Sequence, residues 1–279
     1  MSISDPQQKP RATMLALAIV TACLLASCAS CSKKSRVVDP GGYTGTVADL
    51  IAFVRRALPE GFVYPATLDS TASLLVTANV DGIGAASAAF RNGPSFTDAG
   101  TLTVTAPPPV DTRLVAEYSI PVSSTIQYVY TTYLTFPFDL PLVFDGAAGH
   151  VFHATGSPLI AAFDDTIVSV PLLELTAPQA GATIARANPV TVAWSPGKDG
   201  TVFVTASVFS VSDTTLHVAV ALAQDPVGSL VIPSSRLQRV PVGEATLAVA
   251  RYRVRYKQVG ARRVGQLCES VVTRSVTLQ

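Results

Sequence analysis

The sequence predicts a mainly all-β protein with two β-sandwich-like domains, the first of which opens with one short amphipathic helix. Only 14% of its 279 residues are charged, against about 25% in a typical soluble domain, so little material is available for solvent-exposed helices. Valine and threonine, which favour strands, are abundant. Short apolar stretches alternate with turn-forming residues, which is typical of an antiparallel sandwich rather than of parallel β-α-β units.

The chain starts with the features of an export signal. Lys9 and Arg11 precede an apolar run over residues 14–26, and small residues follow it. A membrane-spanning helix needs about 20 apolar residues, whereas this run ends earlier, at Ser27 and Cys28. We therefore expect residues 1–27 to be a signal peptide.

The end of that run, Leu25-Ala26-Ser27-Cys28, resembles the lipobox of bacterial lipoproteins, with Val20-Thr21-Ala22-Cys23 as an alternative match. Cys28 is the better acceptor, because cleavage before Cys23 would leave two exposed leucines at the mature terminus. The resemblance implies that Cys28 carries several acyl chains, which anchor a protein stably where a single chain does not. It also implies an anchor in the outer membrane, because alanine and not aspartate follows Cys28, and it leaves the side of that membrane open.

The remaining chain divides into three parts. Residues 28–42 are small, polar and turn-forming, which predicts a flexible tether after the lipidated cysteine. Residues 43–170 are expected to form an acidic β-rich domain, opened by a helix over residues 46–58 whose apolar residues recur at helical spacing. Its strands are predicted at residues 73–80, 85–90, 101–105, 113–120, 124–136, 142–144, 150–154, 159–163 and 167–175.

Residues 171–279 are expected to form a second, basic sandwich. The stretch from Leu175 to Thr183 contains a Pro-x-x-Gly sequence, and Val190-Thr191-Val192-Ala193-Trp194 follows it. These motifs resemble the first two strands of bacterial immunoglobulin-like or fibronectin-type-III-like modules. The resemblance implies a sandwich without the immunoglobulin disulfide, and further strands are predicted at residues 201–209, 216–223, 229–232, 245–257 and 270–278.

Charge separates the two predicted domains. Residues 43–170 carry four basic and eleven acidic side chains, whereas residues 171–279 carry eleven basic and six acidic ones. Opposite net charges of this size favour docking of one domain on the other. They also direct attention to the basic half as a surface for anionic partners.

The most regular charged feature is a strand with a cation at every second position: Arg251, Arg253, Arg255 and Lys257. Side chains two residues apart in a strand share a face, so Tyr252 and Val254 should point the other way. A solvated strand face is the simpler interpretation, and it also discourages edge-to-edge aggregation. The functional hypothesis is contact with an anionic partner such as a glycolipid, phospholipid headgroups or the acidic first domain.

Catalytic and metal motifs are weak in this sequence. His150 and His153 form the most tempting metal pair, but an odd spacing places them on opposite faces of a strand, so we expect no metal and no cofactor. The sequence lacks the G-x-S-x-G motif of esterases. After processing, Cys31 and Cys268 remain, and the sequence leaves open whether they pair or stay free.

These observations favour a non-enzymatic, lipid-anchored envelope protein that serves binding, adhesion or assembly. Its expected partners are the membrane, through the lipid, and an envelope protein or an anionic glycolipid; nucleic acid is not expected. The alternative is an exported carbohydrate-binding accessory or hydrolase with its site in the first β-rich domain. In that case Tyr128, Tyr130 or Trp194 would form a sugar-stacking platform, although aromatic residues at strand period are usually core residues.

Overall fold

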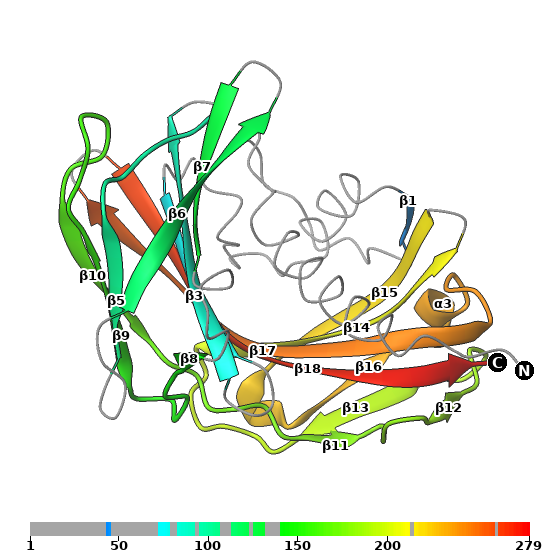
Figure 1. The fold of residues 1–279 in the computed structure, drawn as a ribbon. Coiled ribbons are helices and arrows are strands. Elements are labelled where there is room, and N and C mark those ends of the chain that lie inside the picture. The colour runs from blue at the N-terminus through cyan, green and yellow to red at the C-terminus, as the bar shows by residue number, and fades with distance from the viewer. Residues whose placement is uncertain are drawn as a thin grey trace, which may run out of the picture.

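The structure is a computed structural model that describes residues 43–45, 72–78, 83–92, 95–106, 113–122, 125–131, 140–212, 215–259 and 262–279. The fold is all-β and sandwich-like, as predicted (Figure 1). Cys23, Cys28, Cys31, the tether and the predicted helix over residues 46–58 lie outside the described residues. Within the described ranges, no helix has the length and apolar character needed to cross a membrane.

The elements follow one another in short steps. The strands up to residue 170 are β1 (Tyr43–Gly45), β2 (Ala72–Ala78), β3 (Ile83–Asn92), β4 (Ser95–Phe96), β5 (Leu102–Thr105), β6 (Arg113–Val122), β7 (Thr125–Thr131), β8 (Leu140–Pro141), β9 (Gly149–Ala154) and β10 (Phe163–Val168). After it come β11 (Leu175–Ala177), β12 (Thr183–Ile184), β13 (Val190–Trp194), β14 (Val202–Ser212), β15 (Thr215–Gln224), η2 (Asp225–Val227), β16 (Ser229–Ile232), α3 (Ser234–Leu237), β17 (Gly243–Val259) and β18 (Arg262–Leu278).

Two sheets organise these strands. In the part of the chain that is described, a large sheet has the order β1-β15-β14-β17-β18-β2-β3-β7-β6-β5-β9-β10, and a smaller sheet has the order β11-β13-β16. The smaller sheet packs against β15, β14, β17 and β18 through a shared hydrophobic core that includes Trp194, Ile232 and Leu247. Three strands facing four is the arrangement of immunoglobulin-like and fibronectin-like sandwiches, as the sequence predicted for residues 171–279.

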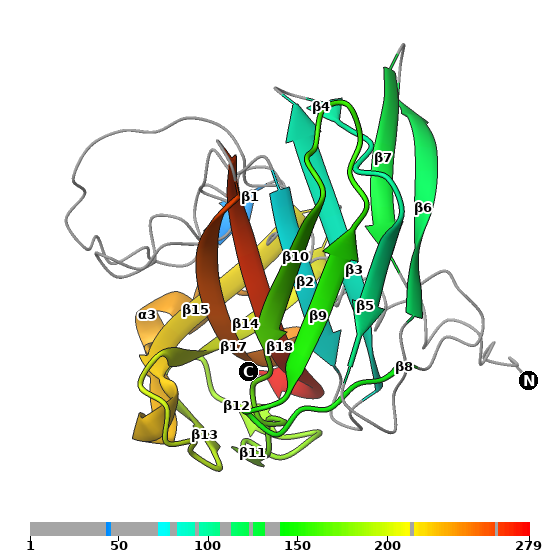
Figure 2. The same ribbon diagram turned by 90° about the vertical axis from the view of Figure 1, so that its left-hand side faces the viewer.

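The β17–β18 hairpin joins the two halves of the chain. Its strands have 17 residues each and stay in register from the Gly243–Leu278 pair to the Val259–Arg262 pair. One part of the hairpin pairs with β14, while β18 also pairs in parallel with β2. The large sheet therefore continues across residue 170, as Figure 2 shows from the side. The predicted domain boundary at that residue stays a prediction.

Apolar residues form a separate core on each side of this joint. The first core contains Phe90, Tyr130 and Phe152 from the strands before residue 170, together with Val202 and Cys268. The second core lies within residues 173–278. In β17, Leu247 and Val249 enter the second core, while Ala250 and Tyr252 pack in a third cluster on the opposite face. Burial on both faces explains why β17 is apolar over much of its length.

Most predicted strands are confirmed within a few residues, but the strand predicted at 159–163 is wrong. Ser157 accepts hydrogen bonds through Oγ from the N–H groups of Leu159 and Ile160, at 3.2 and 3.1 Å, and donates one to the carbonyl of Asp98 at 2.8 Å. Such side-chain bonds compete with a sheet ladder. Gly156, with φ of +85°, turns the chain just before this loop.

The strands predicted at 142–144 and 167–175 are also wrong. Residues 142–144 follow β8 without joining a ladder, although the Phe144 carbonyl accepts a hydrogen bond from the Leu172 N–H at 3.3 Å. Residues 169–174 separate β10 from β11. Their backbone is held mainly by side chains from other strands, which strand periodicity does not report.

Candidate functional site

The predicted row of cations on β17 is not an open surface. Arg251 is 2% exposed and Arg253 is 5% exposed, which corrects the expectation of a solvent-facing or lipid-facing row for these two residues. Arg255 is exposed, and the side chain of Lys257 lies outside the described part of the structure. The predicted alternation holds, because Tyr252 is buried in the cluster on the other face of the sheet.

Arg251 holds the chain segment that connects the two halves. Its Nε donates to Asp225 Oδ1 at 3.0 Å, and its Nη1 donates to the Leu172 carbonyl at 2.7 Å. Its Nη2 donates to the Ser195 carbonyl. The guanidinium group thus connects η2, the end of β13 and the segment before β11. Because both members of the Arg251–Asp225 pair are buried, removal of either would leave an uncompensated charge in the interior.

Asp225 also organises the loop around this pair. It accepts hydrogen bonds from Trp194 Nε1 at 2.9 Å and from the Gly197 N–H at 3.0 Å. A Cβ atom added to Gly197 would lie 2.1 Å from Asp225 Oδ2, so only glycine allows this close approach. Trp194 is therefore an interior residue with a satisfied N–H, not a sugar platform.

Arg253 makes the second set of contacts to the connecting segment. Its Nη1 donates to the Ser169 carbonyl at 2.6 Å and to the Val168 carbonyl at 3.2 Å. Its Nη2 lies 2.6 Å from Asp199 Oδ2. Hydrogen bonds from Thr201, with a smaller contribution from Arg253, lower the pKa of Asp199 to about 2, so this carboxylate is ionised at neutral pH.

Two residues of β18 complete the arrangement. Ser270 Oγ accepts a hydrogen bond from the Leu173 N–H at 2.9 Å, and Arg274 Nη2 donates to the Leu175 carbonyl at 2.6 Å. We call Arg251, Arg253, Ser270 and Arg274 the linker clamp. Its bonds go mainly to backbone groups of residues 168–175, so these side chains fix the path of the chain between the two cores.

Cys268 lies beside the clamp as a buried free thiol. It pairs with Arg253 across the hairpin and is 1% exposed. Burial, the largest cause, raises the pKa of the thiol to about 12, so it stays protonated and unreactive at neutral pH. Its predicted alternative partner, Cys31, lies outside the described residues, and the cysteine acts here as a small core residue.

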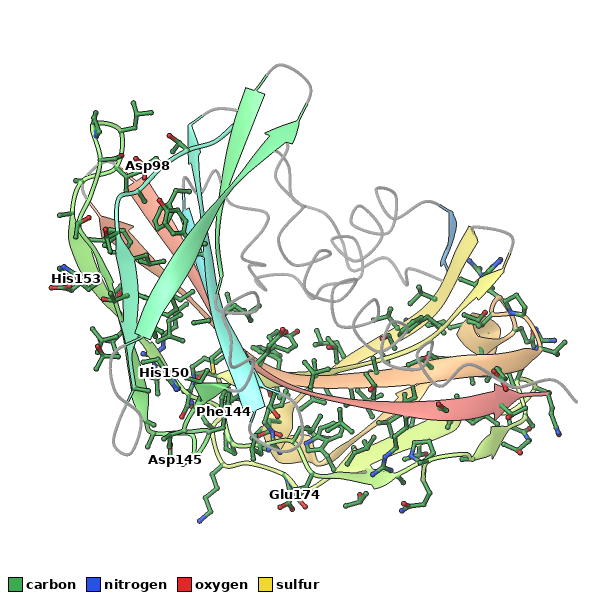
Figure 3. The ribbon with its side chains drawn as sticks, viewed as in Figure 1. Asp98, Phe144, Asp145, His150, His153 and Glu174 are labelled. Atoms are coloured by element: carbon green, nitrogen blue, oxygen red, sulfur yellow. The ribbon has the colours of Figure 1, made fainter. Side chains whose placement is uncertain are left out.

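The two histidines of β9 lie on opposite faces, as predicted (Figure 3). His150 is fully buried, with its ring centroid 5.8 Å from that of Phe144. His153 points outward and contacts the Asp164 carboxylate through Nδ1. In the described part of the chain, no group of three His, Cys, Asp or Glu side chains is placed to hold a metal ion.

The His153–Asp164 pair was not predicted from the sequence. It forms because β9 and β10 pair antiparallel with His153 opposite Asp164, and Thr103 of β5 lies opposite His153 on the other side. The Thr103–His153–Asp164 row carries a nucleophile, a base and an acid, but the side chains of His153 and Asp164 are 55% and 70% exposed on an outer sheet face. A strand predicted at 163–168 would have revealed this pair.

Tyr130 is a core residue and not part of a sugar platform. Its side chain is fully buried and packs edge-on against Phe90, with ring centroids 5.6 Å apart. Its hydroxyl donates to Asp98 Oδ1 and accepts from the Ala99 N–H, each at 2.8 Å. This confirms the core interpretation for Tyr130; the side chain of Tyr128 lies outside the described part of the structure.

The burial of His150 predicts loss of stability in mild acid. Burial lowers the pKa of its imidazole below the ordinary 6.5, so the unfolded chain takes up a proton that the folded chain does not. The free energy of unfolding should therefore fall as the pH drops below 6.5. Urea titrations at about pH 8 and about pH 5 should show a smaller fall for His150→Leu than for the unmodified chain. His153→Gln, which changes an exposed histidine, should leave the slope unchanged; an equally steep fall in His150→Leu would contradict the prediction.

No family model matches the chain, and no curated protein matches it. Solved structures similar to it include the fibronectin(III)-like modules of Clostridium thermocellum CbhA, with 11% identity, 72% of this chain and 89% of that chain covered, and a TM-score of 0.23. A two-domain fibronectin type III segment of chicken tenascin matches with 14% identity, 71% and 95% coverage, and a TM-score of 0.21. The FN1–FN3 domains of chicken CNTN1 match with 10% identity, 70% and 61% coverage, and a TM-score of 0.22. Superpositions this poor carry no argument, and the fold assignment depends on the strand order of the chain itself.

Proposed function

We propose that this chain is a lipid-anchored protein of the bacterial envelope, acylated on Cys28, whose β-sandwiches form a non-enzymatic module for binding, adhesion or assembly. The linker clamp is the observation that supports this most strongly. Arg251 and Arg253, the buried cations of the candidate site, bind backbone carbonyls and structural carboxylates. They stabilise a rigid scaffold suited to presenting a surface at the end of a tether.

The anchor and the scaffold fit together in this proposal. A lipid-anchored protein needs a part that holds its shape outside the bilayer, and the β17–β18 hairpin gives the two cores a common strand pair. The expected partner is an envelope protein or an anionic glycolipid. The sugar-platform alternative loses Tyr130 and Trp194, which are both interior residues.

Acylation of Cys28 gives the direct test. Cells that express the chain are grown with labelled palmitate, and the purified protein is expected to carry the label. Cys28→Ser should abolish incorporation, because the thioether cannot form, whereas Cys23→Ser and Cys31→Ser should retain it. Labelled Cys28→Ser protein would refute the proposed acceptor.

The same strains test the binding module. After crosslinking in intact cells, an envelope protein should co-purify with the acylated chain and be depleted with Cys28→Ser, which is no longer held at the membrane. Hydrolysis of an envelope glycan by the purified chain would instead support the enzymatic alternative.

A further inference from the structure

We infer that one end of the molecule faces the membrane and contacts anionic lipid headgroups. This surface, which we call the α3 end, consists of Arg186, residues 234–244 and the paired ends of β17 and β18 at Gly243 and Leu278. The inference rests on the proposed acylation of Cys28, and it adds to that anchor a defined protein surface and a lipid partner.

The position of β1 gives the first argument. β1 is the described element nearest to Cys28 in the sequence, and it pairs with the start of β15, with Tyr43 opposite Val218 and Gly45 opposite Leu216. α3 lies against the same strand, and Arg236 Nη1 donates to the Val220 carbonyl. Figures 1 and 2 both show β1, β15 and α3 on one side of the molecule. The chain thus comes from the anchor at the side that carries α3.

The length of the tether gives the second argument. Residues 29–42 separate Cys28 from Tyr43, and a segment of this length spans at most about 50 Å. As a flexible coil it would span about 20 Å on average. The 17-residue strands of the hairpin are about 55 Å long at 3.3 Å per residue. The anchor therefore keeps the β1 side closer to the bilayer than the far end of the molecule.

The charges of the α3 end give the third argument. Arg186 Nη1 donates to the carbonyls of Gln238 and Val240, at 3.1 and 2.8 Å, which places Arg186 beside the turn that follows α3. Arg236 and Arg239 lie in α3 and in that turn, and Arg239 is exposed. Carbonyl partners do not cancel the charge of Arg186. Val242, which is 63% exposed, adds an apolar side chain to the same surface.

The opposite end has the opposite charge. The β9–β10 hairpin and the loops around it carry Asp98, Asp145, Asp164 and Asp165. Figure 3 shows the labelled Asp98, Asp145 and His153 on the side away from α3. An anionic bilayer attracts arginines near its surface and repels carboxylates. The tether and the charge distribution therefore favour the same orientation.

Energy transfer on vesicles tests this orientation. The full chain is purified in its acylated form with Cys31→Ser, so that one new cysteine carries the donor dye: Val242→Cys at the α3 end or Thr166→Cys on the exposed face of β10. Acceptor dye is attached to lipid headgroups in vesicles of phosphatidylcholine with or without phosphatidylglycerol. We expect stronger transfer from position 242 than from position 166, and a larger difference when the anionic lipid is present. Equal transfer, or stronger transfer from position 166, would overturn the inference.

A matched pair of charge reversals tests the arginine contact. Arg239→Glu at the α3 end should remove most of the gain caused by phosphatidylglycerol, and about 0.5 M salt should do the same by screening. Lys198→Glu makes the same change of charge at an exposed position outside that end and should keep the gain. An equal loss in both variants, or a gain that neither variant changes, would contradict the assigned surface.

Flotation separates this inference from the proposed function. If the unmodified chain fails to float with the vesicles, Cys28 is not an anchor, and both proposals fall. If the chain floats but the two dye positions give equal transfer, the anchor stands and only the orientation is wrong.

Discussion

Replacing Asp225 with alanine is expected to lower the free energy of unfolding by about 3–5 kcal/mol, the cost of breaking a buried ion pair on one side. Arg251 would remain 2% exposed without its carboxylate, and Trp194 Nε1 would lose its 2.9 Å partner. Urea denaturation monitored by tryptophan fluorescence measures the change, because the chain contains a single tryptophan and it reports on this network.

The matched control is Glu174→Ala. Glu174 is an exposed acid in the segment between β10 and β11, so its removal should change stability by no more than about 0.5 kcal/mol. Asp225→Asn should lie between the two, because an amide oxygen still accepts a hydrogen bond but carries no charge. A loss below about 1 kcal/mol for Asp225→Ala would show that the pair contributes little beyond its neighbours.

Phe152→Ala is expected to cost about 3–5 kcal/mol, because the side chain is fully buried in the first core and its removal leaves a cavity. Although Phe152 and Trp194 belong to different cores, the shared hairpin and the linker clamp should couple the unfolding of the two. Tryptophan fluorescence and far-ultraviolet circular dichroism should therefore give the same, lowered midpoint.

Val151→Ala is the control for this substitution. Val151 is adjacent in β9 but is 37% exposed on the outer face, so its truncation should cost much less. If Phe152→Ala shifts the circular dichroism transition and leaves the tryptophan transition unchanged, the two cores unfold independently, and the clamp does not couple them.

Local sequence patterns were sufficient for much of the fold. Alternation at period two depends on the pleat of a strand, and it correctly placed His150 and His153 on opposite faces and Arg251 and Arg253 on one face. It also identified most strands and the seven-strand sandwich after residue 170. It failed at residues 159–163, because Ser157 makes local side-chain bonds that override strand propensity.

What covers each face was decided by the tertiary structure. Periodicity states that Arg251 and Arg253 share a face, but the carbonyls that bury them belong to residues 168–172, about eighty positions earlier in the chain. The Asp225 carboxylate arrives from η2 in the same way. A row of arginines looks alike in sequence whether water or backbone carbonyls receive its N–H groups, since hydrogen bonds to either satisfy the same donors. The sequence by itself determined the strands and their faces, and only the packing of distant segments made this row an internal clamp.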